Sequence, residues 1–114
     1  CIKNKKFPCS AGNQIRDFVY VDDAVEAMIK SLTNKNARGH IINIGSGKPI
    51  IIKSIVEKVK KISKGGHPQY GLFKQRKSEI PKLYPSVEKA KKKINWRQRI
   101  SFEKGLKKTI NSYK

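Results

Sequence analysis

Hydrophobic residues recur at helical spacing in four segments of the chain. Within each segment the apolar positions lie three or four residues apart, so they fall on one stripe of a helix. The stripes are Val25, Met28, Ile29 and Leu32; Ile52, Ile55, Val56, Val59 and Ile62; Val87, Ala90 and Ile94; and Phe102, Leu106 and Ile110. This spacing predicts four amphipathic helices, each with its stripe against the core.

Capping residues and helix breakers predict where these helices begin and end. Asp22 or Asp23 is a suitable N-cap for the first helix, and Glu26 is a capping-box partner for Asp23. Asn36 and Gly39 end the first unit, and Gly65, Gly66 and Pro68 end the second helix. Pro85 suits the first turn of the third helix, which ends at Asn95 and Trp96, and Ser101 is the N-cap of the fourth helix.

Short runs of β-branched and aromatic residues predict two or three strands between the helices. They cover residues 16–21, 40–44 and 69–73. We expect residues 1–14 and 74–84 to be irregular, since breakers interrupt both. Strands and helices alternate, which is typical of the α/β class.

The chain length and the absence of repeats favour a single domain. At 114 residues the chain is long enough for one small hydrophobic core. Neither an internal repeat nor a low-complexity linker divides it. Residues 1–114 are therefore predicted to form one small mixed lobe.

The chain is strongly basic, with 27 Lys and Arg against 8 Asp and Glu and a net charge of +19. Such a charge is typical of proteins that bind nucleic acid or another anionic surface. Here lysine greatly outnumbers arginine, the residue that binds phosphate bidentately. The basic residues of the last third also alternate with apolar ones, so a solvated lysine-rich surface is the simpler interpretation.

The first residue and the sulfur-containing residues bear on the origin of the chain. It starts at Cys1 and its one methionine is Met28, which indicates a piece of a longer protein. Cys1 and Cys9 make neither a disulfide framework nor a zinc pair, so we interpret them as reduced thiols of a cytoplasmic protein. The longest apolar run, residues 50–52, is far shorter than the ~20 residues of a membrane span.

Two short motifs each resemble a known site, but each lacks a feature that its site requires. Residues 45–48, Gly-Ser-Gly-Lys, resemble a phosphate-binding loop, but Ile42 and Pro49 occupy positions where the Walker pattern needs Gly and Ser or Thr. Tyr70 and Lys74 match the Tyr-x-x-x-Lys pair of short-chain dehydrogenases. That pair needs a helix, and this stretch is predicted to be a strand.

The histidines and Ser46 do not predict a metal site or a nucleophile. His40 and His67 have no cysteine or carboxylate at ligand spacing, and His40 is expected to be structural, beside a buried strand. Ser46 has no visible base partner. We therefore predict no metal-binding and no catalytic residue in this chain.

Four segments in one order resemble a known family. They are residues 14–27, with Arg-Asp-Phe-Val-Tyr-Val-Asp-Asp; residues 42–47, Ile-Asn-Ile-Gly-Ser-Gly; residues 76–79, Arg-Lys-Ser-Glu; and residues 86–106, with Ile-Asn-Trp and Ser-Phe-Glu-Lys-Gly-Leu. Together they are similar to the carboxy-terminal half of the NAD-dependent epimerase/dehydratase family, the extended short-chain dehydrogenases that act on nucleotide sugars. The resemblance implies the carboxy-terminal part of a Rossmann-type enzyme.

The resemblance implies a substrate-binding role for four residues. Arg16 matches an arginine that binds the substrate pyrophosphate, and Asn43 an asparagine that lies against the same phosphates. Arg76 matches a second arginine that holds the pyrophosphate from the other side, and Glu79 an acidic residue that contacts the nucleotide ribose. Ser78 replaces the glycine that is usual in that motif. Guanidinium groups suit this task, since they bind phosphate oxygens in pairs.

The resemblance also implies what the parent enzyme would need. It would be an NAD-dependent nucleotide-sugar epimerase or 4,6-dehydratase, working as a homodimer. Its glycine-rich NAD site and its catalytic residues belong to an amino-terminal Rossmann half without a counterpart here. The chain alone is therefore expected neither to bind NAD nor to turn the sugar over, and whether it binds a nucleotide-diphosphate sugar by itself stays open.

Two other functions remain open at this stage. A small basic nucleic-acid-binding module would show aromatic side chains on a basic face. Phe18, Trp96 and Phe102 are instead expected to be buried. A folding or interaction piece without a ligand is the third possibility. The base, the sugar and the choice between epimerase and dehydratase stay undecided.

Overall fold

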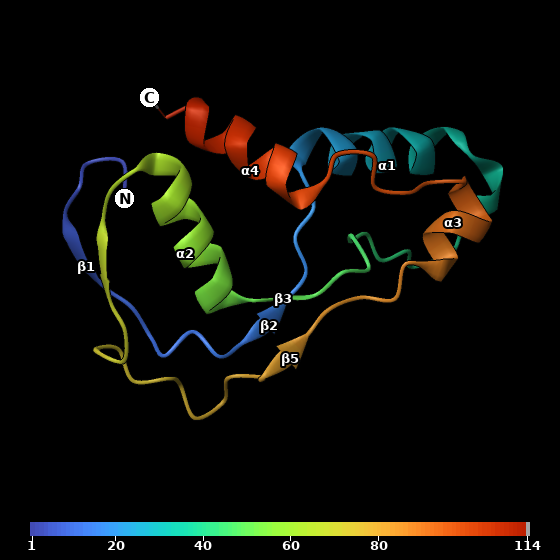
Figure 1. Ribbon diagram of the computed structural model, residues 1–114. Helices are drawn as coiled ribbons and strands as arrows, with labels where there is room; N and C mark the ends of the chain where they lie inside the picture. The colour runs from blue at the N-terminus through green and yellow to red at the C-terminus, as the bar shows by residue number, and fades with distance from the viewer. Residues whose placement is uncertain (114) are drawn as a thin grey trace. The chain divides into compact units, whose positions relative to one another are not determined.

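Four α-helices form where the hydrophobic stripes predict them. The computed structural model describes residues 1–113, and Figure 1 labels its four helices. In that range the helices are α1 (Val21–Thr33), α2 (Ile52–Ser63), α3 (Glu88–Ile94) and α4 (Phe102–Asn111), with a 3-10 turn, η1, at Lys35–Ala37. The mixed α/β class is confirmed. Pro85 does not begin the third helix, which starts at Glu88.

Five very short strands lie in the described part of the chain. They are β1 (Lys6–Pro8), β2 (Ile15–Arg16), β3 (Ile50–Ile51), β4 (His67–Gln69) and β5 (Lys82–Leu83). β1 pairs with β4 in parallel. β2 lies between β3, its antiparallel neighbour, and β5, its parallel neighbour.

The strand positions differ from those that the sequence predicts. Residues 40–44 form no strand, and His40 is exposed, so it is not the structural histidine beside a buried strand that we expected. β1 and β5 form in segments that were predicted to be irregular. The reason is that each strand is set by a distant partner: Arg16, for example, pairs with Leu83. Local β propensity does not report such pairing.

The described chain groups into two compact units. Unit 1 contains Cys1–Arg16, Ile50–Leu83 and the chain from Leu106, and unit 2 contains Asp17–Pro49 and Tyr84–Gly105. That residues 1–114 form a single lobe stays a prediction.

The buried core of unit 2 is built around Trp96. Its side chain is only 1% exposed and packs with Ala27, Ala37, Ala90 and Ile94. The indole Nε1 donates a hydrogen bond of 2.9 Å to the backbone carbonyl of Asp23, so the one polar atom of the ring is satisfied. The small residues on α1 and α3 let the large ring lie between them, and the expected burial of Trp96 is confirmed. The expectation for Phe18 was wrong: it is 37% exposed, with its ring edge-to-face against Phe102.

Asp23 does not cap α1 as the sequence predicts. The N-cap residue is Tyr20, without a side-chain cap bond, and Asp23 lies within the first turn of the helix at 3% exposure. Its carboxylate instead accepts from the backbone N–H groups of Arg99, at 3.2 Å, and Ile100, at 2.9 Å. Both donors are more than 70 residues from Asp23 in sequence. The residues next to Asp23 therefore suggest a helix cap and give no sign of these contacts.

The predicted core stripe of α1 faces outward. Val25 is 46% exposed, Met28 64%, Ile29 57% and Leu32 87%. The buried residues of the helix are Asp23 and Ala27, which lie on another face. The prediction that this stripe covers the core was therefore wrong.

The amino-terminal end of α2 is capped by backbone carbonyls of unit 1. The N–H of Ile52 donates to Gln14 at 2.9 Å, and the N–H of Lys53 donates to Gly12 at 2.8 Å. Gly12 has a φ of +75°, and a Cβ there would meet Lys53 at 3.0–3.2 Å. The close approach at Gly12 thus fixes the loop that leads into β2.

Candidate functional site

Arg16 lies on β2, the central strand of the three-stranded sheet of unit 1. Its Nη1 donates to the carbonyl of its neighbour Ile15 at 2.9 Å, and its Nη2 forms an ion pair with the Glu79 carboxylate. The two side chains are 22% and 27% exposed, so the pair is partly shielded from water. A partly buried arginine with donors left over can accept a second anion.

The segment of residues 76–79 forms a turn that brings Glu79 to Arg16. The N–H of Glu79 donates to the carbonyl of Arg76 at 3.0 Å, and the N–H of Ile15 donates to the carbonyl of Pro81 at 2.8 Å. The second bond ties the end of this segment to β2. Ser78 is not among the described residues with positive φ, so the turn forms without the glycine that the family motif has there.

Arg76 lies on the same turn, and its side chain is exposed. No ion pair engages its guanidinium among the described residues. The structure therefore joins Arg16 directly to Glu79 and places Arg76 three residues from Glu79. Asn43 is an exposed residue of unit 2.

Asp17 binds the glycine loop of unit 2 and was not singled out from the sequence. Its carboxylate accepts from the N–H of Ser46 at 2.9 Å, from the N–H of Gly47 at 2.8 Å, and from the Ser46 hydroxyl. A Cβ on Gly45 would lie 2.8 Å from the Asp17 Oδ2 and 2.5 Å from Pro85 Cγ, so a side chain does not fit. The N–H groups of this loop therefore bind the Asp17 carboxylate. This agrees with the mismatch between residues 45–48 and the phosphate-binding pattern.

Tyr70 is held as a hydrogen-bond donor in unit 1. Its hydroxyl donates to Glu57 Oε1 at 2.6 Å, and the Lys53 ammonium lies 5.0 Å from the ring centroid. Burial, the hydrogen bond to Glu57 and the charge of that carboxylate raise the pKa of Tyr70 above its ordinary value. Proton transfer needs a lowered pKa and a helical Tyr-x-x-x-Lys pair, whereas Tyr70 follows β4 and lies outside any helix.

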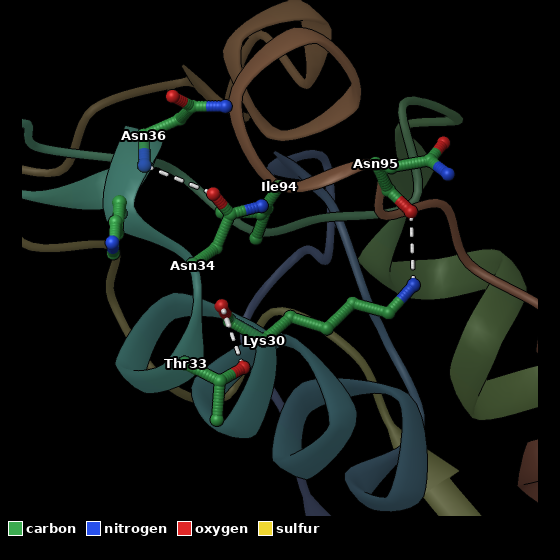
Figure 2. Close-up of a pocket in the computed structure, with 7 residues that line it drawn as sticks. Lys30, Thr33, Asn34, Asn36, Ile94 and Asn95 are labelled. Carbon is green, nitrogen blue, oxygen red and sulfur yellow. Dashed lines mark hydrogen bonds between the residues drawn. The ribbon is translucent and has the colours of Figure 1, made fainter.

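A polar surface pocket of unit 2 contains none of the predicted site residues. It has a volume of about 510 Å³ and is lined by Lys30, Thr33, Asn34, Lys35, Asn36, Ile94 and Asn95 (Figure 2). Lys30 Nζ donates to the Asn95 carbonyl at 2.9 Å, and the Asn34 side chain accepts from the N–H of Asn36 at 2.9 Å. These contacts close the turns between α1, η1 and α3, so the pocket is explained by local structure.

A second pocket of about 510 Å³ in unit 2 lies beside the glycine loop and is basic. Lys48, Lys91 and Arg97 line it together with Glu88. The hydrogen bond from Lys91, 2.9 Å long, and the charge of Lys91 lower the pKa of Glu88. One of the pocket's cations is therefore already paired.

Residues 1–113 contain neither a candidate membrane span nor a cluster of metal ligands. No helix in this range has the length and apolar character that crossing a bilayer requires. No group of three or more His, Cys, Asp and Glu side chains in the same range could hold a metal ion.

Comparison with solved structures identifies the class of this fold. The UDP-glucose 4-epimerase of Thermotoga maritima, solved with UDP-glucose, superposes with a TM-score of 0.88 at 28% identity, over 98% of this chain and 36% of that one. The UDP-glucuronic acid 4-epimerase of Bacillus cereus, solved with NAD, superposes with a TM-score of 0.75 at 26% identity, over 93% of this chain and 32% of that one. The fold is that of the NAD-dependent sugar-nucleotide epimerases and dehydratases.

The chain belongs to the GDP-mannose 4,6 dehydratase family, whose model matches residues 2–109. It is 41% identical over 102 residues to a UDP-glucuronate 4-epimerase of Thermodesulfobacterium geofontis, covering 88% of this chain and 30% of that protein. It is 32% identical over 110 residues to a CDP-abequose synthase of Salmonella muenchen, covering 95% of this chain and 37% of that protein. The family resemblance is thus confirmed, and the chain spans about a third of the length of these relatives.

Proposed function

We propose that residues 1–114 form the nucleotide-sugar-binding lobe of an NAD-dependent sugar epimerase or 4,6-dehydratase, in which Arg16 and Arg76 hold the substrate pyrophosphate. The observation that carries the proposal is the pairing of Arg16 on β2 with Glu79 on the turn that also holds Arg76. Arg16 and Glu79 are 63 residues apart in sequence, and their ion pair within unit 1 supports a shared role.

The chemistry of a pyrophosphate suits two arginines. It carries closely spaced negative charges, and a guanidinium presents parallel N–H donors that bind two oxygens at once. Arg16 is oriented by the Ile15 carbonyl and by Glu79, and Arg76 is free to turn toward an anion. A fixed arginine and a mobile one would bind the substrate with a defined orientation and still admit it.

The family motifs alone suggest roles for Glu79 and Asn43. Glu79 would contact the nucleotide ribose, and Asn43, a residue of unit 2, would lie against the phosphates as the asparagine of its motif does. Support for these two roles is the position of each residue in its family motif, within a match that covers residues 2–109.

In the whole enzyme, bound NAD would supply the oxidation of the sugar at C4 and the return of the hydride. The NAD site and the catalytic residues would lie in an amino-terminal Rossmann half outside residues 1–114, in a cytoplasmic homodimer. The proposal is supported by the Bacillus cereus epimerase, which was solved with NAD and has a chain about three times as long as the part matched here.

Calorimetric titration of the purified chain tests the proposed function. We expect saturable binding of at least one of UDP-glucose, GDP-mannose, CDP-glucose and dTDP-glucose at physiological salt. Arg16→Ala and Arg76→Ala should each weaken it about 10- to 100-fold, because a hydrogen bond to a charged group contributes about 1.5–3 kcal/mol. Arg76→Lys should recover little of the loss, because an ammonium lacks the paired donors.

Arg38→Ala is the matched control, since Arg38 is an exposed arginine of unit 2 outside the proposed site. Asn43→Ala, measured in parallel, tests the asparagine separately. Absence of saturable binding by any of the four compounds in a cooperatively folded sample would contradict the proposal. So would equal losses in Arg16→Ala and Arg38→Ala.

A further inference from the structure

Asp17 binds the glycine loop, residues 45–48, through three donors. Its carboxylate accepts from the N–H of Ser46 at 2.9 Å, from the N–H of Gly47 at 2.8 Å, and from the Ser46 hydroxyl. The hydroxyl oxygen of Ser46 also accepts from the N–H of Lys48 at 2.9 Å, so the contact extends to the end of the loop. Hydrogen bonds to an ionised acceptor are stronger than neutral ones, and three on one carboxylate hold the backbone around it.

The glycine loop begins two residues after Asn43. Asn43 is exposed, whereas its neighbours Ile42 and Ile44 are partly buried and pack against the core of unit 2. Core packing therefore holds the backbone at Asn43, and the Asp17 contact holds the chain that follows. The position of the Asn43 side chain thus depends on Asp17 as well as on the core.

The charge of Asp17 makes its place in the sequence informative. It directly follows Arg16, which the proposed function assigns to the pyrophosphate. A carboxylate near a bound phosphate repels it, so by charge alone Asp17 would weaken the binding of an anion. A benefit of Asp17 to binding therefore has to come from the loop that it holds.

We propose that Asp17 is a positioning residue of the pyrophosphate site, which holds Asn43 in place without touching the phosphates itself. The proposal rests on the proposed function, because Asn43 has a role to be positioned for only if the chain binds a nucleotide diphosphate. Asp17 connects the two motifs, since it follows Arg16 in the sequence and binds the loop that follows Asn43.

The sign of the effect separates positioning from charge. Asp17→Asn removes a negative charge, and charge alone would strengthen the binding of an anion. The amide also has one acceptor oxygen in place of two, so the loop loses part of its attachment. We expect the affinity for inorganic pyrophosphate, measured by calorimetry, to fall about fivefold, the effect of one lost hydrogen bond.

Two further variants control for charge and for folding. Glu88→Gln makes the same change of charge at an exposed position of unit 2, and its affinity should stay within about twofold of the unchanged chain. Ser46→Ala removes the hydroxyl contact without any change of charge and should weaken pyrophosphate binding about twofold. If Asp17→Asn fails to fold in a urea titration, Ser46→Ala takes its place in the comparisons.

A double-mutant cycle tests whether Asp17 acts through Asn43. In an Asn43→Ala chain, Asp17→Asn should change pyrophosphate affinity less than about twofold, because the side chain that it positions is gone. In a Glu79→Gln chain, whose altered residue has no contact with the loop, the loss of about fivefold should remain. A merely structural role of Asp17 would give equal losses in both backgrounds.

The outcomes also separate this proposal from the proposed function. Equal or tighter pyrophosphate binding by Asp17→Asn would overturn the positioning role and leave the proposed function standing. An undiminished loss in the Asn43→Ala chain would overturn it too, because Asp17 would then act without Asn43. If the unchanged chain does not bind pyrophosphate, the positioning role fails, while the titration with the four sugar nucleotides decides separately on the proposed function.

Discussion

Glu79 pairs with Arg16 and has a proposed second role at the nucleotide ribose, and experiment can separate the two. Its carboxylate pairs with Arg16 Nη2, so it occupies a donor that a phosphate would use. The family motif instead assigns it to the ribose of the nucleotide. Inorganic pyrophosphate has no ribose, so it responds only to the first role, whereas UDP responds to both.

We expect Glu79→Gln to bind inorganic pyrophosphate about threefold or more tightly than the unchanged chain, because the amide competes less well for a guanidinium than a carboxylate does. UDP binding should gain less, because the mutant also weakens the ribose contact. Calorimetry with both ligands measures the difference. Glu88→Gln is the control, since Glu88 pairs with Lys91 in unit 2. Weaker pyrophosphate binding by Glu79→Gln would instead mean that Glu79 mainly orients Arg16.

At the residue scale, the family motifs selected two residues that the structure brings into contact, while the binding roles of all four candidate residues stay predictions. Arg16 and Glu79 were chosen from separate motifs, and the structure brings them into contact. Asp17 was missed although it stands next to Arg16, because its partners in the glycine loop are 29 and 30 residues away. A carboxylate that binds backbone N–H groups leaves no pattern in its neighbours, so only tertiary structure reveals it.

At the element scale, Asp23 connects α1 to residues 99 and 100. Its carboxylate accepts two backbone N–H groups at 3% exposure, and its carbonyl accepts from Trp96. We expect Asp23→Ala to lower the free energy of unfolding by about 1–3 kcal/mol, since two buried donors lose their acceptor. Urea unfolding followed by the fluorescence of Trp96, the one tryptophan of the chain, measures this free energy of unfolding.

Glu88→Gln serves as the control for this experiment too, because Glu88 is exposed on α3 and its loss leaves no buried donor. Its unfolding midpoint should match that of the unchanged chain. An Asp23→Ala chain with the same midpoint as the control would show that the buried contacts of Asp23 contribute nothing to stability.

The helices were predictable and their orientation was not. Periodicity located α1 because four apolar positions share one face, but the prediction that this face covers the core was wrong, since Val25, Met28, Ile29 and Leu32 are exposed. The actual packing of α1 uses Ala27 against Trp96, where a small side chain makes room for the ring. The strands were harder still, because each consists of two or three residues and depends on partners elsewhere in the chain.

At the scale of the whole molecule, the net charge of +19 still permits a nucleic-acid-binding function. Trp96 is 1% exposed and Phe18 packs against Phe102, so neither ring is open for stacking on a base, but Phe73, Tyr84 and Tyr113 are 58%, 50% and 74% exposed. The aromatic side chains therefore do not decide between the two functions. We interpret most of the basic residues as a solvated lysine-rich surface, with Arg16 and Arg76 set apart by their place in the family motifs.

The salt dependence of binding distinguishes the two functions. Affinity for a 20-base-pair DNA duplex, if any is measured at 50 mM salt, should fall at least 10-fold by 200 mM, because each phosphate contacted releases counterions. The double variant Arg16→Ala, Arg76→Ala removes only two of 27 cations, so its affinity for DNA should stay within about twofold of the unchanged chain. The same variant should no longer bind a UDP-sugar. Fluorescence anisotropy for DNA and calorimetry for the sugar nucleotide provide the two curves. Tight DNA binding that survives 200 mM salt and depends on these two arginines would favour a nucleic-acid-binding module over the proposed lobe.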